Sequence, residues 1–195
     1  KIFSRYHMSD YQAFYQNEDL WSPGEERYHG AITRVEPYNI LLDVSNIPGL
    51  GSSRDEFTLI QPFTPAGKQN MRAWVGVAQD PGNYGKMVAL EFPKGELERG
   101  PIQVEAIIDQ TGDISTQFTL WEGAGSTVLR GNLPVLPVEG DILYIEPVYL
   151  SAETAPYPQL RRVVAVYKDK AVMEDSLEKA VAAVLGGKIS SSRVE

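Results

Sequence analysis

The stretch that decides the fold is RGNLPVLPVEGDILYIEPVYL, residues 130–150. It is rich in aliphatic and aromatic residues, but three acidic residues and three prolines interrupt it. A helix that spans a bilayer needs about 18–20 consecutive apolar residues, which this stretch lacks. Because proline cannot donate to a strand ladder, the prolines indicate bulges, edges or bends. The sequence therefore predicts a core hairpin of two strands, 126–138 and 141–150, joined at Glu139-Gly140.

Strand-forming runs lie on both sides of this hairpin. A first pair, 38–45 and 56–63, is separated by a loop rich in Gly, Ser and Pro. A second pair, 72–79 and 86–93, flanks the turn sequence DPGNYG. The run 160–168 predicts one more strand.

Helices are predicted near the N-terminus and in the middle of the chain. Ser9 is the expected N-cap of a first helix, with Gln12 closing a capping box and Pro23-Gly24 ending the helix. Residues 100–110 fit either a helix that begins at Pro101 or a strand of alternating apolar residues, and the helix is favoured. Residues 113–121 predict a second central helix with Asp113 as its cap.

The last predicted helix carries the clearest pattern. Asp175 is the expected cap, Glu178 occupies the third helical position, and Gly186-Gly187 ends the helix. Its apolar stripe consists of Leu177, Ala180, Val181, Val184 and Leu185.

These elements predict an α+β fold with a largely antiparallel sheet built from hairpins and short helices at the N-terminus, middle and C-terminus. The length of 195 residues suits one domain. We expect a single soluble domain over residues 1–187, followed by a flexible polar tail at 188–195.

The composition excludes several functions. The chain has no cysteine, which rules out disulfides and thiol chemistry, and only two histidines, whose spacing matches no metal motif. We therefore expect no metal and no cofactor. The formal net charge is −8, and nucleic-acid binding requires clustered cations, so nucleic acid is not an expected partner.

One polar loop is a candidate ligand-binding segment. Gly67-Lys68 resembles the end of a phosphate loop, but the upstream glycine and the following Ser or Thr are missing. The sequence predicts a turn between strands there. Loops on rigid scaffolds often bind ligands, and the candidates in this loop are Lys68, Gln69, Asn70 and Arg72.

A second candidate is a group of carboxylates. If residues 100–110 are helical, Glu105 and Asp109 lie one turn apart on the face opposite the apolar stripe, with Asp113 close by. Neighbouring carboxylates can act as an acid–base pair or hold a divalent cation. The alternative is that they form an ordinary solvated face.

Arg130 and Asn132 are the third candidates, because they lie inside the apolar hairpin. A charge in a core strand is normally paired or at an edge. We expect Arg130 to pair with one of Glu139, Asp141 or Glu146, and both candidates remain possible ligand contacts.

An ordered series of segments resembles Uncharacterised Protein Family 0182. The segments include YHMSDYQAFYQNEDLW, FTLIQPFTPAGKQNMRAWV, GPIQVEAIIDQ, GSTVLRGNLPVLPV and LYIEPVYLSAE, and the match continues through LRRVVAVYKDKAVMEDSLEKAV. The resemblance covers nearly the whole chain, although none of the segments is a catalytic signature.

The resemblance implies a bacterial integral membrane protein with a large extracytoplasmic region, of which this chain would be the C-terminal part. It implies attachment to the cell membrane through spans elsewhere in the protein, and it supplies no catalytic or binding residues.

The function expected from the sequence is therefore a non-catalytic module for binding or assembly at the cell envelope, with a protein or another envelope component as ligand. Two alternatives stay open: a hydrolase that acts on the envelope through paired carboxylates, and a structural domain that packs on the rest of the protein.

Overall fold

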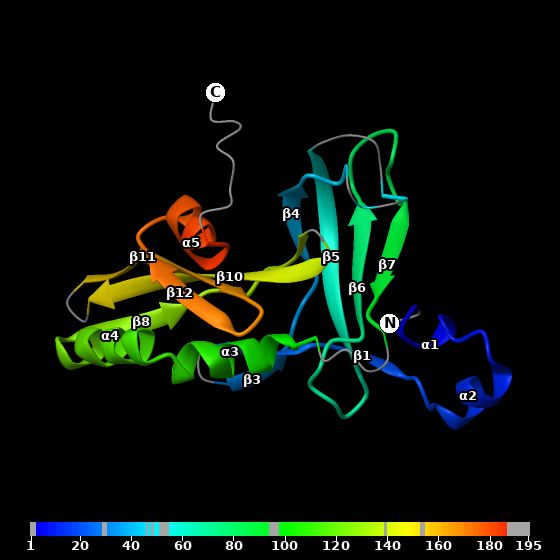
Figure 1. The fold of residues 1–195 in the computed structure, drawn as a ribbon, viewed down its shortest axis with the longest axis horizontal. Coiled ribbons are helices and arrows are strands. Elements are labelled where there is room, and N and C mark those ends of the chain that lie inside the picture. The colour runs from blue at the N-terminus through cyan, green and yellow to red at the C-terminus, as the bar shows by residue number, and fades with distance from the viewer. Residues whose placement is uncertain are drawn as a thin grey trace. The chain divides into compact units, whose positions relative to one another are not determined.

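The computed structural model describes residues 3–28, 31–45, 47, 49–50, 55–93, 98–138, 140–152 and 155–186. Within them the chain forms two compact units. Unit 1 consists of residues 1–25 and 33–103, and unit 2 consists of residues 26–32 and 104–195. The fold is α+β with antiparallel sheets, as the sequence predicts (Figure 1). The prediction of one domain over 1–187 stays a prediction, and the predicted tail 188–195 lies outside the described residues.

Unit 1 contains a five-stranded antiparallel sheet. A long strand, β5, pairs with β6 along one edge, and β6 pairs with β7. The other edge of β5 is shared by two short strands, β4 at its start and β1 at its end. The strands are β1 (Trp21–Pro23), β4 (Tyr38–Leu42), β5 (Glu56–Pro65), β6 (Ala73–Ala78) and β7 (Met87–Glu91).

Two short helices, α1 (Phe3–Tyr6) and α2 (Tyr11–Gln16), precede this sheet. The cap of α2 is Asp10, whose carboxylate accepts hydrogen bonds from the amides of Gln12 and Ala13. The prediction of Ser9 as the cap was therefore wrong by one residue. The helix ends at Asn17, which adopts a left-handed conformation, and Pro23 belongs to β1 instead of ending the helix.

Unit 2 contains a second five-stranded antiparallel sheet. The long strand β10 pairs with β11, which pairs with β12, while β9 and β8 share the other edge of β10. The strands are β8 (Ser126–Arg130), β9 (Val135–Val138), β10 (Asp141–Ala152), β11 (Ala155–Tyr167) and β12 (Lys170–Glu174). The predicted strand 126–138 is thus two strands, because the chain leaves the ladder between Arg130 and Val135, and β12 was not predicted.

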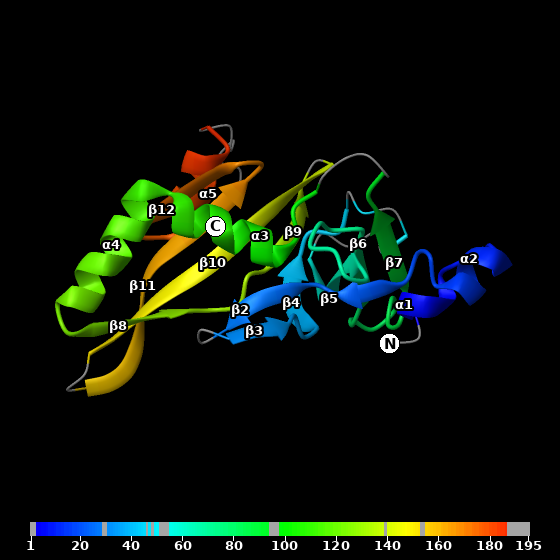
Figure 2. The same ribbon diagram turned by 90° about the horizontal axis from the view of Figure 1, so that it is seen from below.

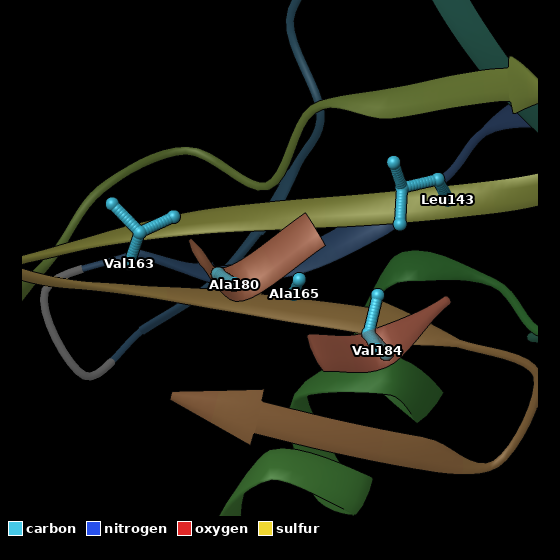
Figure 3. Packing of buried hydrophobic residues seen from close by; sticks show 5 residues of the cluster. All are labelled: Leu143, Val163, Ala165, Ala180 and Val184. Atoms are coloured by element: carbon cyan, nitrogen blue, oxygen red, sulfur yellow. The ribbon is translucent and has the colours of Figure 1, made fainter. Parts of the chain in front are cut away.

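Helices cover both faces of the unit 2 sheet (Figures 1 and 2). On one face, α5 (Leu177–Val184) packs Ala180 and Val184 against Leu143, Val163 and Ala165 (Figure 3). The cap of α5 is Ser176, which accepts a hydrogen bond from the Lys179 amide, and not Asp175 as predicted.

The helices α3 (Pro101–Gln110) and α4 (Gly112–Gly123) come before β8 in the chain. Residues 100–110 therefore resolve to the favoured helix. Thr111 occupies the cap position of α4 without a side-chain cap bond, so the prediction of Asp113 as the cap was wrong. A separate two-stranded sheet consists of β2 (Glu25–Tyr28) and β3 (Ala31–Arg34).

The two five-stranded sheets have the same topology in the same chain order. In each, the first short strand pairs with the end of the long strand, and the second short strand pairs with its start. The corresponding pairs are β1 and β8, β4 and β9, β5 and β10, β6 and β11, and β7 and β12.

The pairing registers align individual residues of the two sheets. Gln61 pairs with Val75 in unit 1, and Glu146 pairs with Val164 in unit 2. This register places the sequence Ile-Gln-Pro at 60–62 on Ile-Glu-Pro at 145–147. It also aligns Lys-Met-Val at the start of β7 with Lys-Ala-Val at the start of β12.

A matching hydrogen bond confirms the alignment. The Gly24 amide, just after β1, donates to the Pro62 carbonyl at 3.0 Å. The Gly131 amide, just after β8, donates to the Pro147 carbonyl at 2.9 Å. In each unit, the residue that follows the first short strand is therefore a glycine whose amide is hydrogen-bonded to a proline of the long strand.

Candidate functional site

Charged residues from α3, β8 and β10 meet in unit 2. We call Glu105, Asp109, Arg130 and Glu146 the ion cluster. Glu146 points inward from β10 and is 1% exposed, and the Arg130 side chain is 16% exposed. Because a buried charge is costly unless it is paired, the arrangement requires that these residues compensate one another.

Arg130 is the centre of the ion cluster. Its Nε and one terminal nitrogen donate to the two carboxylate oxygens of Glu146, the latter at 2.9 Å. The other terminal nitrogen donates to Asp109 at 2.5 Å. A bidentate contact of this kind fixes both position and orientation of a guanidinium group. Of the three partners predicted for Arg130, Glu146 is the one it takes.

Glu105 is attached to the backbone of β2. The Arg27 amide donates to both of its carboxylate oxygens, at 2.9 and 2.7 Å. The Arg27 side chain forms an ion pair with Asp109 at 3.3 Å. Glu105 is 4% exposed, so it does not belong to a solvated face as the alternative reading had it.

Burial dominates the protonation of these carboxyl groups. Burial raises the pKa of Glu105 to about 7, against the opposing effects of the Arg27 amide and the Arg130 charge, and the Glu146 and Glu26 charges raise it further. Burial also raises the pKa of Glu146, which the hydrogen bonds from Arg130 oppose. For Arg130 burial favours deprotonation, but the Glu146 hydrogen bonds and the surrounding carboxylates outweigh it and raise the pKa, so Arg130 stays cationic.

Beside the ion cluster, unit 2 has an open groove of about 480 Å³, which we call the Arg130 groove. It lies where the chain passes from β8 to β9. Apart from Arg130 and Asn132, its lining is apolar or backbone, and it contains three prolines and one aromatic ring. The lining residues are Leu129, Arg130, Gly131, Asn132, Pro134, Pro147, Tyr149 and Pro158.

A second groove of unit 2, of about 510 Å³, lies between α4 and β12. Its charged lining residues are Asp113, Arg162, Glu174 and Asp175. Asp113 lines this second groove, whereas Glu105 and Asp109 belong to the ion cluster. In the described part of the chain, no three His, Asp or Glu side chains are grouped so as to hold a metal ion.

The predicted loop candidates lie in unit 1, between β5 and β6. Gly67 has a φ of 75°, and the Lys68 amide donates to the Pro65 carbonyl, which makes this segment the predicted turn. Lys68 and Gln69 are exposed, and Asn70 accepts a hydrogen bond from Gln103 at 3.4 Å.

Arg72 is part of an ion-pair network within unit 1. It donates to the Phe92 carbonyl and forms ion pairs with Glu91 at 3.3 Å and Asp19 at 3.8 Å. It also lies over the Trp21 ring. These contacts account for Arg72 as a structural residue that joins β6, β7 and the segment before β1.

Comparison with known proteins identifies relatives of this sequence. The model of the uncharacterised protein family UPF0182 matches residues 1–121. The chain belongs to UPF0182. It is 44% identical to a UPF0182 protein of Methanospirillum hungatei over 96% of its length, and 46% identical to one of Desulforamulus reducens over 95%. A UPF0182 protein of Salinibacter ruber is 43% identical over 98%.

The chain spans about a fifth of the length of these UPF0182 relatives, 20%, 19% and 20% respectively. No solved structure matches it. Of the helices that the structure describes, none combines the length and the apolar character needed to cross a membrane.

Proposed function

We propose that this UPF0182 chain is a binding module without catalytic activity, and that the Arg130 groove is the place where it contacts its partner. The observation that carries the proposal is the state of Arg130. Three of its five N–H groups are held by Glu146 and Asp109. These bonds hold Arg130, a lining residue of the groove, in one conformation before a partner binds, so little side-chain freedom is lost on binding.

The chemistry of the groove suits a polypeptide partner. Apolar and proline-rich walls favour burial of apolar side chains, and the Asn132 side chain can orient a carbonyl or carboxylate oxygen. The volume lies within the range of about 300–1,000 Å³ that is usual for ligand sites.

The family resemblance supports a further part of the proposal. The module would act outside the cytoplasm, in a protein attached to the cell membrane, and its partner would be another protein or an envelope component. The net charge of −8 argues against direct adsorption to anionic headgroups, because like charges repel.

Site-specific photo-cross-linking in the cell that makes the protein tests this proposal. A benzophenone amino acid at Tyr149 should cross-link to a discrete partner. The same group at Tyr84, which is 75% exposed in unit 1, should not. Equal cross-linking at the two positions, or none at Tyr149, would contradict a binding site in the groove.

One observation favours a second function. A buried carboxyl group with a pKa of about 7 is what a general acid or base requires at neutral pH, and Glu105 meets that condition. A hydrolase that acts on the envelope is therefore the alternative. Against it, the Arg27 amide holds both oxygens of Glu105, and neither groove includes Glu105 among its described lining residues.

Hydrolysis of isolated envelope material by the wild-type chain, abolished in Glu105→Gln, would decide for the hydrolase. Unchanged material after prolonged incubation supports the binding module.

A further inference from the structure

The repeated topology gives the Arg130 groove a counterpart in unit 1. The glycine–proline hydrogen bond identifies it: Gly24 and Pro62 correspond to Gly131 and Pro147. The next position of the same face aligns Thr64 with Tyr149. The counterpart is therefore the surface around Gly24, Pro62 and Thr64.

In unit 1 the chain itself fills that surface. A Cβ built on Gly24 would lie 3.2 Å from Pro101 Cδ and 3.8 Å from Pro62 Cγ, so Pro101 sits directly over the glycine. A Cβ built on Gly100 would lie 3.4 Å from the Thr64 methyl group. Gly100-Pro101 thus occupies in unit 1 the place that corresponds to the Arg130 groove.

The fit of this segment is close. A Cβ on Gly100 would lie 1.8 Å from the Gln69 carbonyl oxygen, so no other residue can take its place without a shift of the backbone. Two residues earlier, the Glu98 carbonyl accepts a hydrogen bond from the Met71 amide at 2.8 Å. The segment 98–101 is bound like a peptide ligand that belongs to the same chain.

In unit 2 the corresponding surface is open. The three atoms nearest to a Cβ built on Gly131 belong to Pro147 and the Tyr149 ring, which both line the groove. Leu160, which pairs with Tyr149 across β10 and β11, is 57% exposed. An exposed leucine beside the Tyr149 ring adds apolar surface at the edge of the groove.

We propose that the Arg130 groove binds an extended polypeptide segment that contains Gly-Pro, in the place that Gly100-Pro101 takes in unit 1. This inference rests on the proposed function, because it names the partner class of the same groove. The replacement of Thr64 by Tyr149 fits a proline ligand, since aromatic rings are the usual surface for proline side chains in peptide recognition.

The test is a titration of the complete isotope-labelled chain followed by NMR. The probe is the heptapeptide ERGPIQV, which has the sequence of residues 98–104, and the control peptide carries alanine in place of proline. We expect the amide signals of Gly131, Asn132 and Tyr149 to shift with the probe, with a Kd of about 0.1–1 mM, as is usual for a short flexible peptide. The alanine peptide should bind at least about fivefold more weakly.

A matched pair of variants tests the position of the peptide. Leu160→Asp places a charge beside Tyr149, its partner across β10 and β11, and should weaken binding about tenfold. Leu177→Asp introduces the same change at a leucine that is 48% exposed on α5, and it should leave the Kd within twofold. Both positions are exposed, so both variants are expected to fold.

The outcomes separate the two proposals. If the heptapeptide shifts no groove signal while the cross-linker at Tyr149 still captures a partner, the Gly-Pro inference is wrong and the binding module stands. If neither experiment gives a signal, both are wrong. Equal affinity of the proline and alanine peptides, or equal effects of the two aspartate variants, also overturns the inference.

Discussion

In unit 1 the ring of Trp74 lies along its own strand over Gly76. This face of the unit 1 sheet corresponds to the face of the unit 2 sheet that α5 covers. The register aligns Trp74 with Val163 and Gly76 with Ala165, so one large side chain and one glycine stand where unit 2 has two smaller apolar residues and a helix. Two aligned positions differ in charge. Unit 1 has the uncharged residues Pro23 and Gln61 where unit 2 has Arg130 and Glu146.

The comparison separates what the topology requires from what each unit has added. Gln61 satisfies its position by donating to the Val35 carbonyl at 3.0 Å, without any charge. A charge at this register is therefore not needed to form the sheet. The Arg130–Glu146 pair is therefore a feature of unit 2 alone, and a buried ion pair by itself is weak evidence for stability.

The largest effect is expected from removing Arg130. Arg130→Met leaves Glu146 buried without its partner, and we expect the free energy of unfolding to fall by about 3–5 kcal/mol. Urea denaturation measures this loss. The control is Pro23→Ala, at the aligned position in unit 1, which should change stability by less than about 1 kcal/mol because no buried charge depends on it. Equal losses would mean that the two positions do not differ as described.

The next effect concerns pH and belongs to unit 2. The pKa of Glu105 is raised from 4.5 to about 7, so the folded state holds the proton more tightly than the unfolded state. The resulting stability is complete below pH 4.5 and is lost as the pH rises to about 7. The loss should amount to about 3 kcal/mol.

Denaturation midpoints between pH 4 and 8 check this prediction. The Glu105→Gln variant cannot titrate at this position and should lack the loss. A parallel pH dependence in both proteins would assign the titration to another group.

A third prediction concerns the covering of the sheets. Gly76→Ala places a methyl group 2.6 Å from the Trp74 ring and should cost about 1–3 kcal/mol. In a Trp74→Val background, which copies Val163 of unit 2, the same change should be neutral or favourable, because alanine costs less chain entropy than glycine. The four proteins form a double-mutant cycle, and additive effects would contradict the alignment of the two sheets.

The smallest effect is expected at the helix caps. Ser176→Ala removes the cap of α5, which is packed on the sheet, and should cost about 1 kcal/mol. Asp10→Ala removes the cap of α2, which has no buried residue, so global stability should change less. Thermal unfolding of both variants measures the difference, and a larger loss for Asp10→Ala would reverse this view of α2.

Much of the fold could be predicted from the sequence because the strands and helices are marked locally. Alternation and turn residues identify β4 to β7 and the hairpin around β10, and the 3.6-residue period identifies α5. Two of the three cap errors arose where two capping residues are adjacent, Ser9 with Asp10 and Asp175 with Ser176, and the third placed the cap of α4 at Asp113 instead of Thr111. Only the final backbone conformation decides between such neighbours.

The site was predictable only in part. The sequence predicts that Arg130 pairs with one of three acidic residues nearby in the chain, and Glu146 is among them. The contact of Glu105 with Arg27 spans 78 residues, and no local pattern carries that information. The signal that sequence reasoning missed is the similarity of Ile-Gln-Pro at 60–62 to Ile-Glu-Pro at 145–147, which points to the repeated sheet and to the changed residue within it.

The strand β2 has a consequence for synthesis. Its residue Arg27 lies between β1 and β4 of unit 1 in the chain, but its amide binds Glu105 of unit 2. At about 5–20 residues per second, the ribosome adds the 78 intervening residues in roughly 4–16 s. Four of the five strands of unit 1, β4 to β7, are made within that interval, and β1 is made just before it. Unit 1 is therefore translated in full before Glu105 is made, although β2, which lies between β1 and β4 in the chain, needs Glu105 to accept the hydrogen bond of its Arg27 amide.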